Sequence, residues 1–221
     1  MNRSVIIQLI FGLAGAGALV WLGAWQLQRL DAKQAVLSEI EARMLEVPVD
    51  LPLNPSQERD RYLPVAVAGK FDGQEIHVLA SSKRYGAGHR VIGVFLVGER
   101  RILVDRGFVA PEAKNTSRPA KNVAITGNLH WPDEIDSYTP KPDLAANIWF
   151  ARDVAALARA LNTEPVLIVA RSYTGDDIRP YPVSTAAIPN NHLGYAITWF
   201  LLALVWLGMT GMLAWRIKRR T

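Results

Sequence analysis

SVIIQLIFGLAGAGALVWLGAWQL, residues 4–27, and LGYAITWFLLALVWLGMTGMLAW, residues 193–215, are the two stretches that decide the architecture of this chain. Neither stretch contains a charged residue. Each is about 23 residues long, and about 20 residues of helix cross the hydrocarbon core of a bilayer. Aromatic residues that favour the membrane interface stand at the ends of both runs: Trp21, Trp25, Tyr195, Trp199 and Trp215. The sequence therefore predicts two transmembrane helices.

A cleaved signal peptide is the alternative interpretation of the first run, with Arg3 before it and Ala14-Gly15-Ala16 as the cleavage site. The apolar region of a signal peptide is about 7–15 residues long, whereas this run continues past that site. We therefore expect an anchor that is retained.

The distribution of charge gives an orientation. The chain has 25 Lys and Arg against 20 Asp and Glu, and its net charge is +5. The whole excess lies outside the two runs, at Arg3, Arg216, Lys218, Arg219 and Arg220. By the positive-inside rule we expect a multi-pass protein of the cell inner membrane, with both termini cytoplasmic and the central region periplasmic. The central region is formally neutral, so the excess indicates topology and not nucleic-acid binding.

The domain organisation follows from these runs. We predict a first span at 4–27, an amphipathic stalk helix at 28–46, an extracytoplasmic domain at 47–191, a second span at 192–215 and a basic tail at 216–221. Leu30, Leu37 and Met44 repeat at intervals of seven residues and give the stalk its apolar side.

The central region has the pattern of an antiparallel β-rich domain, a small barrel or sheet, with one short helix. The fold class is thus α+β with two flanking membrane helices. We predict strands at 63–71, 75–81, 90–97, 101–109, 122–131 and 165–170, with a hairpin turn at Val97-Gly98-Glu99-Arg100-Arg101. Residues 153–161 are the predicted helix, because Val154, Leu157 and Leu161 share one face.

Several kinds of chemistry are excluded by what the chain lacks. It has no cysteine, so disulfides, thiolate metal sites and cysteine nucleophiles are absent. Its four histidines lie far apart in the sequence, and phosphate-loop, Gly-x-Ser-x-Gly and dinucleotide-binding motifs are missing. We therefore predict that the protein is not an enzyme.

His192 is the remaining candidate for a functional side chain. It stands at the outer mouth of the second span, and Tyr195, Trp199 and Trp206 follow at +3, +7 and +14 on one helical stripe. An imidazole beside such a stripe suits the axial position of an apolar metal macrocycle. An interfacial histidine that binds a lipid headgroup or a loop carbonyl is the alternative. For a ligand, we expect a nearby carbonyl or amide, for example that of the Asn190-Asn191 turn, to hold the other ring N–H.

These motifs are similar to those of the Surfeit locus protein 1 family, the membrane assembly factors of haem–copper terminal oxidases. The matching segments are GAWQLQR (23–29) with Lys33, Tyr62 with Val65, Gly69 and Phe71, Gly88 before the strand at 91–96, VDRGFV (104–109), Gly127, Trp149, and NNHLGYAITWF (190–200). Asp105 and Phe108 depart from the Asn and Trp that are equally expected at these positions.

The resemblance implies a role in cytochrome c oxidase maturation, with haem a as a transient cargo and His192 as the ligand of its iron. Tyr195 and Trp199 are then expected to pack on the macrocycle, and Arg29 to pair with a propionate. Trp25, Gln26, Arg106 and Gly107 are motif residues without an assigned role, although Arg106 suits either a bound carboxylate or a partner within the domain.

The partners implied are oxidase subunit I, haem a synthase and membrane lipid. The alternative function is a membrane scaffold that holds an oxidase subunit and binds no haem. Two further alternatives are an extracytoplasmic sensor, disfavoured by the short tail after Trp215, and a copper chaperone, disfavoured by zero cysteines and only four methionines.

Overall fold

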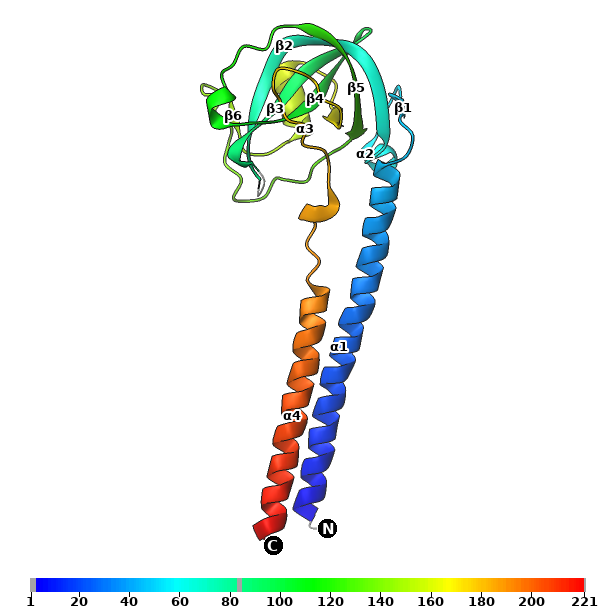
Figure 1. Ribbon diagram of the computed structural model, residues 1–221, viewed down its shortest axis with the longest axis vertical. Helices are drawn as coiled ribbons and strands as arrows, with labels where there is room; N and C mark the ends of the chain where they lie inside the picture. Colours follow the sequence, from blue (N-terminus) through cyan, green and yellow to red (C-terminus); the bar gives the residue numbers. More distant parts are fainter. Residues whose placement is uncertain (1–2, 83–84, 221) are drawn as a thin grey trace. The chain divides into compact units, whose positions relative to one another are not determined.

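The computed structural model describes residues 3–82 and 85–220, and it divides into two compact units. One unit contains residues 3–39 and 185–220, and the other contains residues 40–184. Helix α1 (Arg3–Met44) begins in the first unit and ends in the second (Figure 1). It covers the first apolar run and the predicted stalk as one continuous helix.

The first unit is an antiparallel pair of helices, α1 and α4 (His192–Arg220), preceded by the short turn η2 (Thr185–Ala187). Both helices are long and apolar enough to cross a membrane. Only 17% of the apolar window in α1 and 11% of that in α4 is buried within the protein. The remaining apolar surface needs lipid to cover it, in agreement with the two predicted spans.

Glycines set how closely these two helices approach. A Cβ atom at Gly12, Gly15 or Gly23 of α1 would lie 2.1–2.6 Å from an α4 side chain, respectively Thr210, Trp206 and Phe200. The indole Nε1 of Trp206 also donates a hydrogen bond of 2.9 Å to the Gly12 carbonyl oxygen. Without a hydrophobic driving force in lipid, small residues at the interface allow the close packing that holds such helices together.

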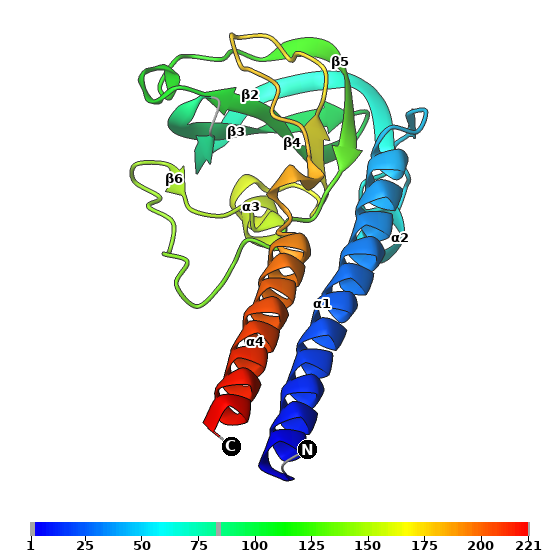
Figure 2. The same cartoon turned by 60° about the horizontal axis from the view of Figure 1, so that its bottom comes forward.

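The second unit is a closed five-stranded barrel (Figures 1 and 2). Its strands are β2 (Pro64–Ser82), β3 (Gly86–Val97), β4 (Arg100–Val109), β5 (Lys121–Leu129) and β7 (Leu167–Ala170). β5 returns to pair with β2, and β7 lies between β4 and β5 and closes the circle. The order β5-β2-β3-β4 is that of a Greek key, so the domain is a Greek-key barrel, the general architecture that OB folds also have.

Smaller elements surround the barrel. They are β1 (Val49–Asp50), α2 (Gln57–Asp60), η1 (Pro111–Ala113), β6 (Ile148–Trp149) and α3 (Val154–Leu161). The predicted fold class is confirmed: two apolar helices flank a β-rich domain that has one principal short helix. The β3–β4 hairpin is also confirmed, with Gly98 at φ +58° in its turn.

Two details of the predicted sheet are wrong. The strands expected at 63–71 and 75–81 are one strand, β2, which pairs with β5 up to Phe71 and with β3 through Ser82. A register shift between Phe71 and Glu75, with Gly73 at φ +92°, bends the strand so that it can serve both partners. The sheet is also mixed, because β7 runs parallel to β4, and β1 and β6 run parallel to β2.

Two large apolar clusters and a smaller one stabilise this unit among its described residues. Ile102 and Val104 point into the barrel, where they pack with Phe95 and other interior residues, whereas Leu103 between them points outward. The outward cluster lies under α3, which buries Val154, Leu157 and Leu161 as the sequence pattern predicts. Asp153 caps this helix by accepting a hydrogen bond from the Ala156 amide at 3.0 Å.

Candidate functional site

His192 is the first residue of α4, and its imidazole meets a side chain of the other helix. Its Nδ1 atom lies 2.8 Å from Oε1 of Gln26 on α1. The two residues are 166 positions apart in the sequence. An amide thus holds the ring nitrogen as expected, but it belongs to Gln26 and not to the Asn190-Asn191 turn: the Asn191 carbonyl oxygen instead accepts from the Tyr195 amide and begins the helix.

The aromatic stripe after His192 divides into two parts. His192, Trp199 and Trp206 are spaced by seven residues and are half-buried, and His192 and Trp206 contact α1 at Gln26 and Gly12. Tyr195 is 57% exposed. A seven-residue repeat keeps one line of a helix against its neighbour, whereas a position at +3 lies toward the edge of that line. Tyr195 thus offers its ring outward, whereas Trp199 is half-buried.

The remaining predicted residues of this unit lie on α1. Trp25 precedes Gln26 and is 43% exposed, and Arg29 is exposed about one turn after Trp25. The predicted residues of this unit thus provide one imidazole held by an amide, two exposed aromatic rings and one exposed guanidinium, and the structure shows the contact between His192 and Gln26. This set offers one nitrogen ligand, apolar surface and one positive charge.

Arg106 and Gly107 lie in the barrel unit, on β4. Arg106 is 2% exposed, and its guanidinium donates to the side-chain and main-chain oxygens of Thr174, at 3.3 and 3.1 Å, and to the Asp176 carboxylate. It also stacks on the Phe71 ring, 4.3 Å from the centroid. These partners all belong to the same unit, so Arg106 is engaged inside the barrel.

A buried ion-pair network beside α3 was not predicted from the sequence. Asp105 is fully buried and accepts from Arg90 Nε at 2.6 Å and from Arg152 Nη1 at 3.2 Å. Arg152 also pairs with Glu134, and these contacts outweigh burial and keep the pKa of the Glu134 carboxyl below its ordinary value. No pattern of neighbouring residues predicts this network, because its members come from four separate segments of the chain.

A second unpredicted cluster joins two histidines of neighbouring strands. His77 Nε2 lies 2.9 Å from Glu75 Oε1, and Arg118 donates to the same oxygen at 2.6 Å. The His77 and His89 rings are 6.2 Å apart, and burial lowers the pKa of His89. Within residues 3–82 and 85–220, no three His, Asp or Glu side chains gather so as to hold a metal ion.

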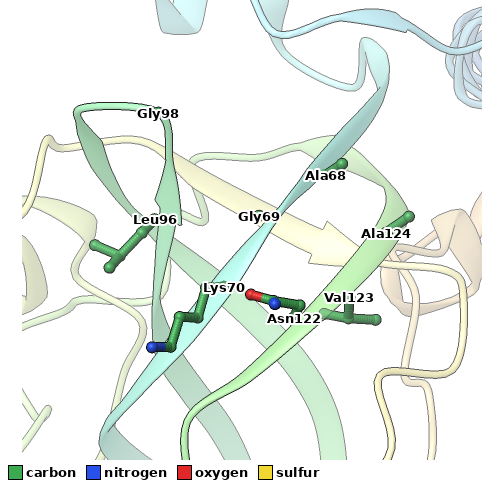
Figure 3. Close-up of a pocket in the computed structure, with 8 residues that line it drawn as sticks. All are labelled: Ala68, Gly69, Lys70, Leu96, Gly98, Asn122, Val123 and Ala124. Carbon is green, nitrogen blue, oxygen red and sulfur yellow. The ribbon is translucent and has the colours of Figure 1, made fainter.

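The outer surface of the barrel carries a hollow of about 580 Å³ (Figure 3). Small and aliphatic residues of β2, β3 and β5 line most of it, with the Lys70 and Asn122 side chains at one side. Gly69 at its floor is required by packing, since a Cβ atom there would lie 2.1 Å from the Leu96 carbonyl oxygen. The hollow offers shape, one lysine amine and one side-chain amide.

Two membrane-length helices, one before and one after a Greek-key barrel in the sequence, and a histidine at the start of the second helix define the class: a membrane-anchored protein with one candidate ligand. Comparison with known families identifies it further. The SURF1 family matches residues 13–204, and the chain belongs to this family.

Individual relatives agree with this assignment. Surfeit locus protein 1 of Xenopus tropicalis is 29% identical over 208 residues, which are 81% of this chain and 66% of that protein. The human Surfeit locus protein 1 is 30% identical over 82% of this chain and 69% of that protein. A SURF1-like protein of Rickettsia prowazekii (strain Madrid E) is 32% identical over 84% of this chain and 81% of that protein. The chain thus spans just under two thirds of the first of these relatives.

Proposed function

We propose that this protein is an assembly factor for a haem–copper terminal oxidase, and that it carries haem a for insertion into subunit I. The first part is supported by membership of the SURF1 family, a family involved in cytochrome oxidase assembly. The second part is carried by one observation: His192 stands at the start of α4 with its Nδ1 atom 2.8 Å from the Gln26 side-chain oxygen. A ring nitrogen held in this way is typical of histidines that bind metals.

The residues present fit haem a as a cargo. A neutral imidazole is a common axial ligand of haem iron. The hydrocarbon tail of haem a favours the bilayer beside these helices, since each buried CH₂ contributes about 0.8 kcal/mol. Arg29 is exposed on α1 and supplies the charge that a propionate needs, because guanidinium–carboxylate pairs are strong hydrogen bonds. Tyr195 and Trp25 supply exposed aromatic surface.

In this proposal haem a synthase delivers the cargo, oxidase subunit I receives it, and membrane lipid surrounds α1 and α4. A carrier must release what it binds. One protein ligand plus apolar packing gives a moderate affinity, whereas two strong ligands would retain the haem. The alternative function is a scaffold that binds an oxidase subunit and no haem. The pairing of Asp105 and Arg106 with side chains of their own unit favours this alternative, because these two charges are engaged within the barrel unit.

The test is to co-express the protein with haem a synthesis enzymes, purify it from membranes and record its Soret spectrum and haem content. We expect bound haem in the wild type, its loss in His192→Ala, and its loss or a shifted Soret band in His192→Met. Protein level in the membrane and binding to subunit I are measured for each variant as controls.

Three results would contradict the proposal at different levels. If both variants keep the wild-type haem content and Soret band, His192 is not the ligand and the alternative of an interfacial histidine holds. If the wild type itself binds no haem, the scaffold function holds. If deletion of the gene leaves the haem a content of the cell's oxidase unchanged, the assembly role itself is wrong.

A further inference from the structure

We infer that Gln26 is a positioning residue for His192: its side-chain oxygen holds the imidazole in the Nδ1–H tautomer, so that Nε2 is the nitrogen presented to a metal. The inference deepens the proposed function and, in its metal-binding part, rests on it. The site then consists of two side chains from two helices, and not of one histidine alone.

The hydrogen bond decides the tautomer. The Oε1 atom of Gln26 is a carbonyl oxygen, which only accepts hydrogen bonds, and it lies 2.8 Å from Nδ1 of His192. The proton must therefore be on Nδ1. A neutral imidazole carries one N–H, so Nε2 keeps its lone pair. Without Gln26, both tautomers are open to the ring.

The backbone holds both partners in place. Gln26 lies within the continuous helix α1, and His192 opens α4. One turn further into the pair, Ala196 is 1% exposed, and Gly23 brings α1 within contact of the Phe200 ring. The separation of Nδ1 and Oε1 is thus fixed by helix packing and not by the preceding connection. Groups on rigid elements are held more accurately than groups on loops.

The neighbouring asparagines do not replace Gln26. The Asn191 carbonyl oxygen accepts from the Tyr195 amide at 3.2 Å. The Asn190 Oδ1 atom is buried and has no hydrogen-bond partner among the described residues. Gln26 is therefore the group that orients the ring, and this gives a physical role to the glutamine of the GAWQLQR segment.

A neutral amide partner for the imidazole suits a carrier, which must release its cargo. Hydrogen bonding to the distal N–H of a metal-bound imidazole orients the ring and raises its basicity, and the loss of such a partner typically costs about 10- to 100-fold in metal affinity. A carboxylate would pull the Nδ1 proton more strongly and tighten the metal bond further. The neutral carbonyl of Gln26 orients the ring without that added strength.

The first test needs no haem. Full-length protein labelled with ¹⁵N-histidine is placed in lipid nanodiscs at about pH 8, where free imidazole is neutral. The His192 signals are assigned by their absence in His192→Ala. We expect the Nδ1–H tautomer in the wild type and in Gln26→Glu, which keeps an oxygen acceptor. In Gln26→Leu we expect a mixture that contains the Nε2–H form.

The second test is a haem a titration of the same variants. We expect Gln26→Leu to bind about 10- to 100-fold more weakly than the wild type. Gln28→Leu is the matched control, since Gln28 is exposed two residues along the same helix, and its affinity should be unchanged.

The outcomes separate this inference from the proposed function. An Nε2–H tautomer in the wild type, or wild-type tautomer and affinity in Gln26→Leu, overturns the positioning role, even where His192→Ala loses haem. If His192→Ala keeps its haem, the proposed ligand is wrong and the metal-binding part of the inference fails with it. The tautomer result still decides whether the Gln26–His192 hydrogen bond orients the ring.

Discussion

His130 is a buried imidazole among positive charges. It is 8% exposed, and its ring stacks on Tyr62 with 5.4 Å between the centroids. Burial, together with the charges of Arg152 and Arg61, lowers its pKa from 6.5 to about 3, although Glu134 opposes the shift. His130 is therefore neutral in the folded protein at all but very acid pH.

This burial predicts a pH-dependent stability. Between pH 6.5 and about 3 the unfolded chain binds a proton at His130 that the folded protein does not, so stability falls as the pH falls. From pH 7 to pH 5 the loss is about 2 kcal/mol. We expect His130→Phe, which keeps an aromatic ring beside Tyr62, to lose less stability over this interval. Denaturant unfolding of both full-length proteins in detergent, at pH 7 and at pH 5, measures their free energies of unfolding.

His89 provides the internal reference for that experiment. Burial also lowers the pKa of His89, so it contributes a loss of the same sign in both proteins. The difference between wild type and His130→Phe then isolates His130. Equal losses of stability in the two proteins would show that His130 is not held neutral.

At the scale of elements, β4 depends on a glycine where another segment crosses it. Gly107 has φ +125°, and a Cβ atom there would lie 2.1 Å from the Arg179 carbonyl oxygen. The same carbonyl accepts from the Phe108 amide at 2.8 Å, and the Arg179 amide donates to the Phe108 carbonyl oxygen at 3.0 Å. Gly107 is thus the point at which the segment after β7 is joined to the barrel.

We predict that Gly107→Ala destabilises the barrel by about 3 kcal/mol or more, since it adds a clash to an unfavourable backbone angle. Gly98→Ala is the control: its φ of +58° is also positive, but the space beside it is open. The Gly98→Ala substitution should lower the free energy of unfolding by about 1–2 kcal/mol. Thermal unfolding followed by circular dichroism compares the two variants, and equal melting temperatures would contradict the role given to the crossing.

At the scale of the whole molecule, the charges predict how the chain is threaded through the membrane. The excess Lys and Arg lie before α1's apolar run and at the end of α4, and the residues between are balanced. We predict cytoplasmic termini and a periplasmic barrel. A reporter active only in the periplasm should be silent when fused after Thr221. It should be active when inserted between Asn115 and Ser117, which are exposed in the loop after η1. The reverse pattern would overturn this topology.

The sequence alone determined those features that depend on neighbouring residues. Two uncharged runs predict two membrane-length helices, because the bilayer sets their length and excludes charge. The hairpin at Gly98 and the helix at 154–161 follow from turn chemistry and from apolar spacing. His192 was singled out by its place at the mouth of a span, and its role as a ligand remains a prediction.

Only the tertiary structure decided what joins distant segments. The closure of the barrel by β7, the change of partner along β2 and the network around Asp105 each need contacts between residues far apart in the chain. Gln26 and His192 are the clearest case: each stands in a recognisable motif, but 166 residues separate them. Local patterns record which side of a helix is apolar and not which residue of another helix lies opposite. That register comes from glycine-mediated packing of α1 on α4, which exists only in the folded pair.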